Sequence, residues 1–192
     1  NSETAVDTQD FHKKQLSFFQ DEVDKVDRTQ QQFVVTHFHR PLYCSDDGAC
    51  SQPGKPNKLS KQAETMFYNA KVDLCITGHV HAYERTLPVY NEQVMTTDLA
   101  SKTYAAPIYI LQGASGNREN NKGESSWPNP EPAWSAGHSS EVGYGLLTVE
   151  SAASNAVPTL HWTFFRSSDN EALDSFTLSK QSENKAIRQT TT

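Results

Sequence analysis

The sequence lacks several features that would assign it to a class of protein at once. No stretch approaches the ~18 to 20 apolar residues that a membrane-spanning helix needs. Basic side chains are not in excess either, because 17 Lys and Arg against 23 Asp and Glu give a formal net charge of −6. That balance argues against nucleic acid as a partner. Aromatic residues make up 10% of the 192 residues, too many for a chain that is disordered throughout. We therefore predict a folded domain, or a large part of one, with no nucleic-acid partner and no membrane span.

The chain also lacks an initiator Met and the basic and apolar regions of a signal peptide, so we expect a processed or truncated product. Cysteine is scarce, with three residues in all. Cys44 and Cys50 enclose a short polar loop with an Asp-Gly turn, and we interpret them as a local disulfide. Cys75 lies in an apolar run, where a thiol is more often a small buried hydrophobe than a nucleophile. The disulfide implies an oxidising compartment, either secreted or lysosomal/vacuolar.

Hydrophobic spacing in the first part of the chain predicts alternating helices and strands. Apolar residues recur at spacings of three and four over residues 10–26 and 60–69, which is typical of amphipathic helices. Runs of β-branched and aromatic residues over 32–38 and 72–77 predict buried strands. The order strand, helix, strand indicates a parallel crossover.

The second part of the chain changes to short extended segments separated by Gly, Pro, Asn and Ser. We expect strands over 108–111, 145–149, 159–165 and 175–178. The segment 117–138 is too rich in turn residues for an element, so it is either an ordered loop beside a site or a mobile excursion. Trp127 and Trp134 within it could shape a substrate entrance or anchor the loop. The whole pattern favours a layered α/β fold.

Three of the seven histidines fall at predicted strand ends, where an α/β sheet usually places its ligand site. Gly78-His79-Val80-His81 directly follows a predicted strand, and residues i and i+2 of an extended segment project to the same side. The end of the other strand contributes His39. Imidazoles that converge from two adjacent strands would form a metal half-site. A His-x-His pair by itself is common by chance, so the surrounding sequence has to decide.

The sequence around these histidines resembles a known family. Residues 78–85, Gly-His-Val-His-Ala-Tyr-Glu-Arg, resemble the metallophosphoesterase signature, and the Tyr-Glu-Arg ending is similar to that of the purple acid phosphatases. Residues 39–43, His-Arg-Pro-Leu-Tyr, resemble the earlier histidine motif of that family, and residues 107–117 resemble its later Gly-rich strand and turn. The resemblance covers about residues 10–180, in order.

The resemblance implies a layered α/β/β/α metallophosphoesterase sandwich, of which residues 1–180 would be the C-terminal half and 181–192 a polar tail. It also implies a metal-dependent acid phosphatase, in which two metal ions, Fe(III) with Zn, Mn or Fe(II), hold a hydroxide that attacks a phosphate monoester. By the same resemblance, His39 and His79 would bind the divalent ion and His81 the ferric one. A phosphodiesterase of the same superfamily and a non-catalytic binding or structural module are the alternatives.

The remaining ligand motifs of that family are missing. Gly-Asp-x-Gly, Gly-Asp-x-x-Tyr and Gly-Asn-His, which carry the bridging Asp, the iron-binding Tyr and the Asn, do not occur in this sequence. Three imidazoles without an anionic bridge do not offset the repulsion between two closely spaced cations. We therefore expect that the N-terminal half is a separate chain or has been lost. This chain alone would have little activity, and the exposed apolar edge of its sheet would favour a partner.

Four further residues have two interpretations each. His37 shares a strand face with His39, so it could contact the substrate, a small-molecule phosphate ester, or donate a proton, or it could pack behind the site. Asn117 follows a Gly-rich turn and could lie at the pocket rim or serve the turn alone. Glu84 and Arg85 could act as an acid and a phosphate clamp, but we favour a buried structural ion pair. The general acid stays unassigned.

Overall fold

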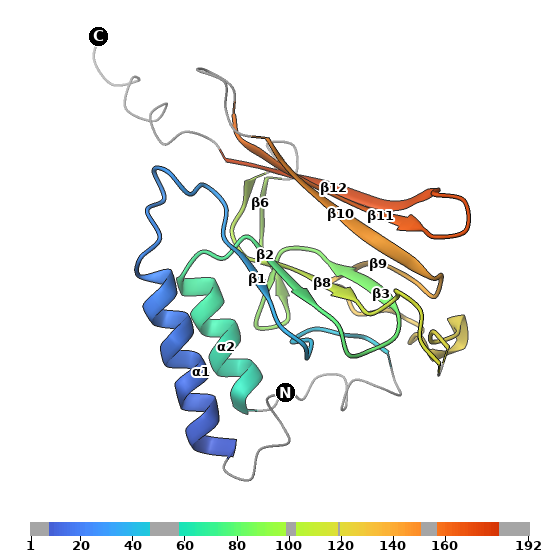
Figure 1. The fold of residues 1–192 in the computed structure, drawn as a ribbon, viewed down its shortest axis with the longest axis horizontal. Coiled ribbons are helices and arrows are strands. Elements are labelled where there is room, and N and C mark those ends of the chain that lie inside the picture. The colour runs from blue at the N-terminus through green and yellow to red at the C-terminus, as the bar shows by residue number, and fades with distance from the viewer. Residues whose placement is uncertain (1–7, 47–57, 99–102, 119, 151–156, 181–192) are drawn as a thin grey trace.

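The computed structural model describes residues 8–46, 58–98, 103–118, 120–150 and 157–180. The described residues form three layers (Figure 1). Helices α1 (Thr8–Val23) and α2 (Lys58–Asn69) lie on one face of a five-stranded sheet, and a three-stranded sheet lies on its other face. These are three of the four layers that the resemblance implies for the complete domain, because no helix in the described ranges covers the outer face of the smaller sheet.

The five-stranded sheet has the order β1-β2-β8-β3-β9. Its strands are β1 (Val35–His37), β2 (Leu74–Thr77), β3 (Tyr83–Thr86), β8 (Ile108–Gln112) and β9 (Ser135–Ser139). β1, β2 and β8 run parallel, whereas β3 is antiparallel to both β8 and β9. The predicted parallel crossover from β1 through α2 to β2 is confirmed. The carboxyl ends of the parallel strands therefore meet at one edge of the sheet.

The three-stranded sheet is an antiparallel meander of β10 (Gly143–Glu150), β11 (Thr159–Arg166) and β12 (Ala172–Ser179). Each of its strands extends a segment that the sequence predicts. Four short strands between β3 and β8 form two hairpins, namely β4 (Val89–Tyr90) with β5 (Gln93–Val94) and β6 (Thr96–Asp98) with β7 (Thr103–Tyr104). A 3-10 turn, η1 (Glu124–Ser126), lies between β8 and β9.

Tyr83 joins the two sheets. Its ring stacks on Phe164 with the ring centroids 4.0 Å apart. Its hydroxyl donates to Asp174 Oδ2 at 2.6 Å and accepts from Trp162 Nε1 at 3.2 Å. Burial raises the pKa of the Tyr83 phenol, so the hydroxyl remains a donor. The apolar ring and its satisfied hydroxyl thus lie in the core between the sheets.

The two residues after Tyr83 face opposite sides of β3. Arg85 binds Asp174 through Nε at 2.6 Å and Nη2 at 2.8 Å. Glu84, which is 2% exposed, instead accepts from Ser45 N–H at 2.9 Å, Ser45 Oγ at 2.6 Å and Ser135 Oγ at 3.0 Å. Burial raises the pKa of Glu84, although these donors act in the other direction. The expected ion pair between Glu84 and Arg85 is therefore wrong, because neighbouring residues of a strand point to opposite faces.

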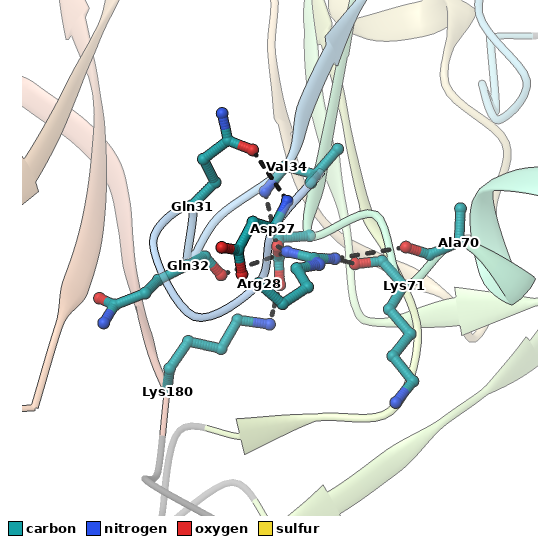
Figure 2. Close-up of polar contacts among 9 residues, drawn as sticks. Asp27, Arg28, Gln31, Gln32, Val34, Ala70, Lys71 and Lys180 are labelled. Carbon is teal, nitrogen blue, oxygen red and sulfur yellow. Dashed lines mark hydrogen bonds and ion pairs between the residues drawn. The ribbon is translucent and has the colours of Figure 1, made fainter. Parts of the chain in front are cut away.

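The amino end of β2 carries a dense polar network (Figure 2). Asp73 Oδ2 accepts from the Val34 N–H at 2.8 Å and from Arg28 Nη1 at 3.1 Å, and Lys180 Nζ binds Asp73 Oδ1. Arg28 also donates to the Ala70 carbonyl at 3.3 Å. This network joins the segment before β1, the turn after α2 and the end of β12.

The boundaries of the elements show where the sequence prediction fails. The strand expected over 32–38 is confined to β1, whose alternate residues are exposed, so the prediction of a buried strand there is wrong. β3 is not among the predicted strands, and the segment 117–138, predicted to be a loop, contains η1 and most of β9. The predicted tail 181–192 lies outside the described residues. Among the residues that the structure describes, no helix has the length and apolar character to cross a membrane.

Candidate metal-binding site

The Gly-His-Val-His segment forms a tight turn immediately after β2. The Val80 N–H donates to the Gly78 carbonyl at 2.9 Å, and the Ala82 N–H donates to the Val80 carbonyl at 2.9 Å. His79 lies at the centre of the first of these γ-turns and has a φ of 72°. A γ-turn with a positive φ is the rare and strained form. Such strain persists only where the surrounding structure imposes it, and it is concentrated at functional sites.

His39 and His79 are brought together at the carboxyl ends of β1 and β2. His39 Nε2 and His79 Nδ1 lie 3.2 Å apart, with the two rings inclined at 72°. Two nitrogens that each bind one tetrahedral metal ion at about 2.0–2.1 Å are about 3.3 Å from each other. The Gly78 N–H donates to the His39 carbonyl at 3.0 Å and so holds the two strand ends in this arrangement. The donor atoms of the pair therefore fit a single shared ion.

His81 lies further along the same turn, and its carbonyl accepts from the Lys122 N–H at 2.8 Å. Within the ranges that the structure describes, no three His, Cys, Asp or Glu side chains are arranged to hold a metal ion. The structure thus brings together His39 and His79 but does not place His81 in a three-ligand group with them. Metal binding by the three histidines stays a prediction.

The back of the turn is closely packed. The Gly113 N–H, at the end of β8, donates to the Ala82 carbonyl at 3.0 Å. A Cβ atom at Gly113 would lie 1.8 Å from the Val80 carbonyl oxygen, so only glycine fits there. Val80 and Ala82 belong to a buried cluster with Leu111 and two further residues, Cys44 and Trp127. The glycine motif is visible in the sequence, but the close approach of its backbone to the histidine turn is not.

The chain is similar to a protein-family model and to several known proteins. Residues 106–175 match the family model for the iron/zinc purple acid phosphatase-like protein C. The chain is 32% identical over 169 residues to purple acid phosphatase 5 of Arabidopsis thaliana, which covers 86% of this chain and 40% of that protein. This chain belongs to the purple acid phosphatase family. It is also 29% identical to a nucleotide pyrophosphatase/phosphodiesterase of Hordeum vulgare, over 85% of this chain and 43% of that protein.

The fold is that of the purple acid phosphatases as well. A purple acid phosphatase from yellow lupin (Lupinus luteus) seeds superposes with a TM-score of 0.72 and 22% sequence identity. The match covers 93% of this chain but 29% of the lupin chain. The predicted α/β fold is confirmed, and the chain represents part of a purple acid phosphatase domain. It spans less than half of the length of the curated relatives named above.

The sequence suggests two other residues for the candidate site, His37 and Asn117. His37 is exposed in β1, two residues before His39. Asn117 is half-buried, and its Nδ2 lies 3.5 Å from Asn121 Oδ1. Asn121 in turn donates to the Ser140 carbonyl at 3.1 Å, which anchors the turn after β8. Substrate contact by His37 and Asn117 stays a prediction.

The cysteines divide into two cases. Cys75 is free and fully buried, as expected of a small core residue. Burial raises the pKa of its thiol to about 12, which excludes a thiolate at neutral pH. Cys44 is also buried, but Cys50 lies outside the described residues. The disulfide between Cys44 and Cys50 therefore stays a prediction.

Proposed function

We propose that this chain is the histidine-bearing C-terminal part of a dinuclear-metal acid phosphatase that hydrolyses phosphate monoesters. The observation that carries the proposal is the 3.2 Å separation of His39 Nε2 and His79 Nδ1 at the ends of two parallel strands. Membership of the purple acid phosphatase family supports it. The carboxyl ends of parallel strands are also where α/β folds usually bind ligands.

The cofactors that we assign are two metal ions, Fe(III) with Zn, Mn or Fe(II). His39 and His79 would share the divalent ion, and His81 would bind the ferric one. When bound, the pair of ions supplies Lewis acidity that activates water and stabilises charge on the phosphate oxygens. The chain itself supplies orientation, because the γ-turn fixes the backbone of His79 and the bond from the Gly78 N–H fixes the backbone of His39. His37 and Asn117 would contact the substrate from the rim.

The proposed enzyme needs ligands that this sequence does not contain. We infer that they come from the N-terminal half of the domain, supplied as a separate chain or as a segment not included in these 192 residues. Two exposed apolar regions support this. β1 pairs with β2 along one side, and its Val35 is 37% exposed, while Leu146 in β10 is 53% exposed. The N-terminal half would cover these regions. Because it would also supply the remaining metal ligands, this chain alone would have little activity.

The matched test compares three histidine variants in the assembled protein, by which we mean this chain together with the rest of its domain. His79→Ala and His81→Ala should abolish hydrolysis of p-nitrophenyl phosphate. His161→Ala is the control, because His161 is exposed in β11 and its Nδ1 lies 2.9 Å from Thr177 Oγ1. Hydrolysis by His79→Ala at the rate of His161→Ala would refute the assignment.

A phosphodiesterase is the second candidate, favoured by the similarity to the barley nucleotide pyrophosphatase/phosphodiesterase. The same two-ion chemistry would serve a diester, so the difference lies in how the site accommodates the second ester group. Hydrolysis of p-nitrophenyl phosphate and of bis-p-nitrophenyl phosphate by the assembled protein separates the two. A higher kcat/KM for the diester would favour this second candidate.

We also infer an oxidising compartment, secreted or lysosomal/vacuolar, from the predicted bond between Cys44 and Cys50. Reduction of that bond adds two hydrogens to the chain, which intact mass spectrometry detects as about 2 Da. A mass that reduction does not change would remove the basis for this compartment.

A further inference from the structure

The turn that carries the metal-site histidines is fixed from behind. Val80 and Ala82, which alternate with His79 and His81, are 2% and 0% exposed. Because Val80 and Ala82 are the chain neighbours of the two histidines, their burial holds the backbone from which both imidazoles project. A side chain that packs in the cluster with Val80 and Ala82 therefore restricts the orientation of His79 and His81.

Trp127 is the largest side chain in the buried cluster behind the turn. It is 8% exposed and lies in the same buried cluster as Val80 and Ala82. It belongs to the loop between β8 and β9, which leaves the sheet beside the turn between β2 and β3 (Figure 1). The same loop contributes Lys122, whose N–H donates to the His81 carbonyl at 2.8 Å.

Trp127 is itself held on its other sides. Its indole N–H donates to Ser140 Oγ at 3.3 Å. Its ring stacks on the imidazole of His138, with the centroids 4.2 Å apart and the planes inclined at 26°. His138 belongs to β9, which pairs with β3 in the five-stranded sheet. The indole is thus fixed between the sheet and the histidine turn.

We propose that Trp127 is a positioning residue, which holds His79 and His81 in the orientation that binds the metal ions. This inference rests on the proposed function. The φ of 72° at His79 is a conformation that a residue with a side chain keeps only under the constraint of its surroundings. Removal of the indole leaves a cavity in the cluster that contains Val80 and Ala82, and the turn then relaxes toward an unstrained backbone.

Two variants serve as references for Trp127→Ala. Trp134→Ala removes the same type of side chain just before β9, where Trp134 packs edge-on against Tyr43 with ring centroids 5.2 Å apart. Trp134 therefore supports the core on the helical side of the sheet. Trp127→Phe is the conservative variant, because it keeps an aromatic ring in the cluster with Val80 but loses the hydrogen bond to Ser140.

Hydrogen exchange in the metal-free chain measures the turn itself. Trp127→Ala should raise the exchange rate of a peptide covering residues 78–82 by about tenfold or more over the wild type, because local opening becomes easier. Trp127→Phe and Trp134→Ala should stay near the wild-type rate in this peptide. Equal rates in Trp127→Ala and wild type would overturn the proposal. So would a uniform rise along the whole chain, since it would indicate a general loss of stability.

Zinc affinity of the assembled protein, measured by titration calorimetry, separates this inference from the proposed function. Trp127→Ala should raise the Kd for zinc about tenfold to hundredfold, the range typical of residues that orient a metal ligand. Trp127→Phe should restore most of the affinity and Trp134→Ala should not change it. An unchanged Kd in Trp127→Ala would overturn the positioning role alone. No zinc binding by the wild type would contradict the proposed function and, with it, the role of Trp127 toward the metal.

Discussion

The two ends of β2 use polar residues in opposite ways. At its amino end, the Asp73 carboxylate, with its side chain 8% exposed, is enclosed by donors from Val34, Arg28 and Lys180 (Figure 2). At its carboxyl end, His79 is held in a strained turn and faces the exposed His39. Satisfied polar groups stabilise a fold, whereas strained and accessible ones are typical of a site. The comparison predicts that substitutions at the two ends change different properties.

The largest effect on stability is expected at the amino end. Asp73→Ala leaves Arg28 and Lys180 without their carboxylate and leaves the Val34 N–H without its acceptor, so we expect a loss of about 3 kcal/mol in the free energy of unfolding. Urea unfolding measures this loss. Asp169→Ala, which removes an exposed partner of Arg166, is the control and should cost less than about 1 kcal/mol. Similar losses in the two variants would remove the distinction between the amino end and an ordinary surface pair.

A smaller loss of stability with a large loss of metal affinity is expected at Gly113. Gly113→Ala forces a Cβ atom to within 1.8 Å of the Val80 carbonyl oxygen, so the histidine turn must move. Overpacking of this kind costs about 1–3 kcal/mol. The control is Gly123→Ala, because the nearest atom to a Cβ there is Ser125 Oγ at 4.0 Å. Thermal unfolding and zinc titration of both variants check the prediction, which fails if Gly113→Ala binds zinc as tightly as Gly123→Ala.

The smallest expected effect on stability is at the strained residue His79, where one substitution should be more stable than another. Both His79→Ala and His79→Gly remove the imidazole, but only glycine adopts a φ of 72° without penalty. The left-handed conformation costs a non-glycine residue about 1–2 kcal/mol, so His79→Gly should be the more stable variant by about 1 kcal/mol. Urea unfolding of the two variants isolates the strain from the loss of the ring. Equal stability would mean that the turn carries no strain.

Local pattern predicts the frame of this fold but not its long-range contacts. The helices and the parallel crossover are visible as hydrophobic spacing. The first strand is predicted too long because Phe33 and Val34 are partly buried against the two core clusters, although they do not belong to β1. β9 is missed because its residues, Ser-Ala-Gly-His-Ser, have little intrinsic strand preference and are ordered by pairing with β3.

The two ends of β2 also differ in how much of their structure can be predicted from the sequence. The histidines of the candidate site are visible from sequence because the motif places them at strand ends. The partners of Asp73 are not visible, since Val34 and Lys180 are 39 and 107 positions away in the chain. The strain at His79 is also hidden, because it depends on the packing of Gly113 and Trp127 behind the turn.

The most direct test of the account is a crystal structure of the zinc-loaded assembled protein, with anomalous scattering to locate the metal. The account predicts an ion within about 2.0–2.1 Å of both His39 Nε2 and His79 Nδ1. A zinc-loaded structure in which this pair binds no ion, while zinc occupies other ligands, would contradict it.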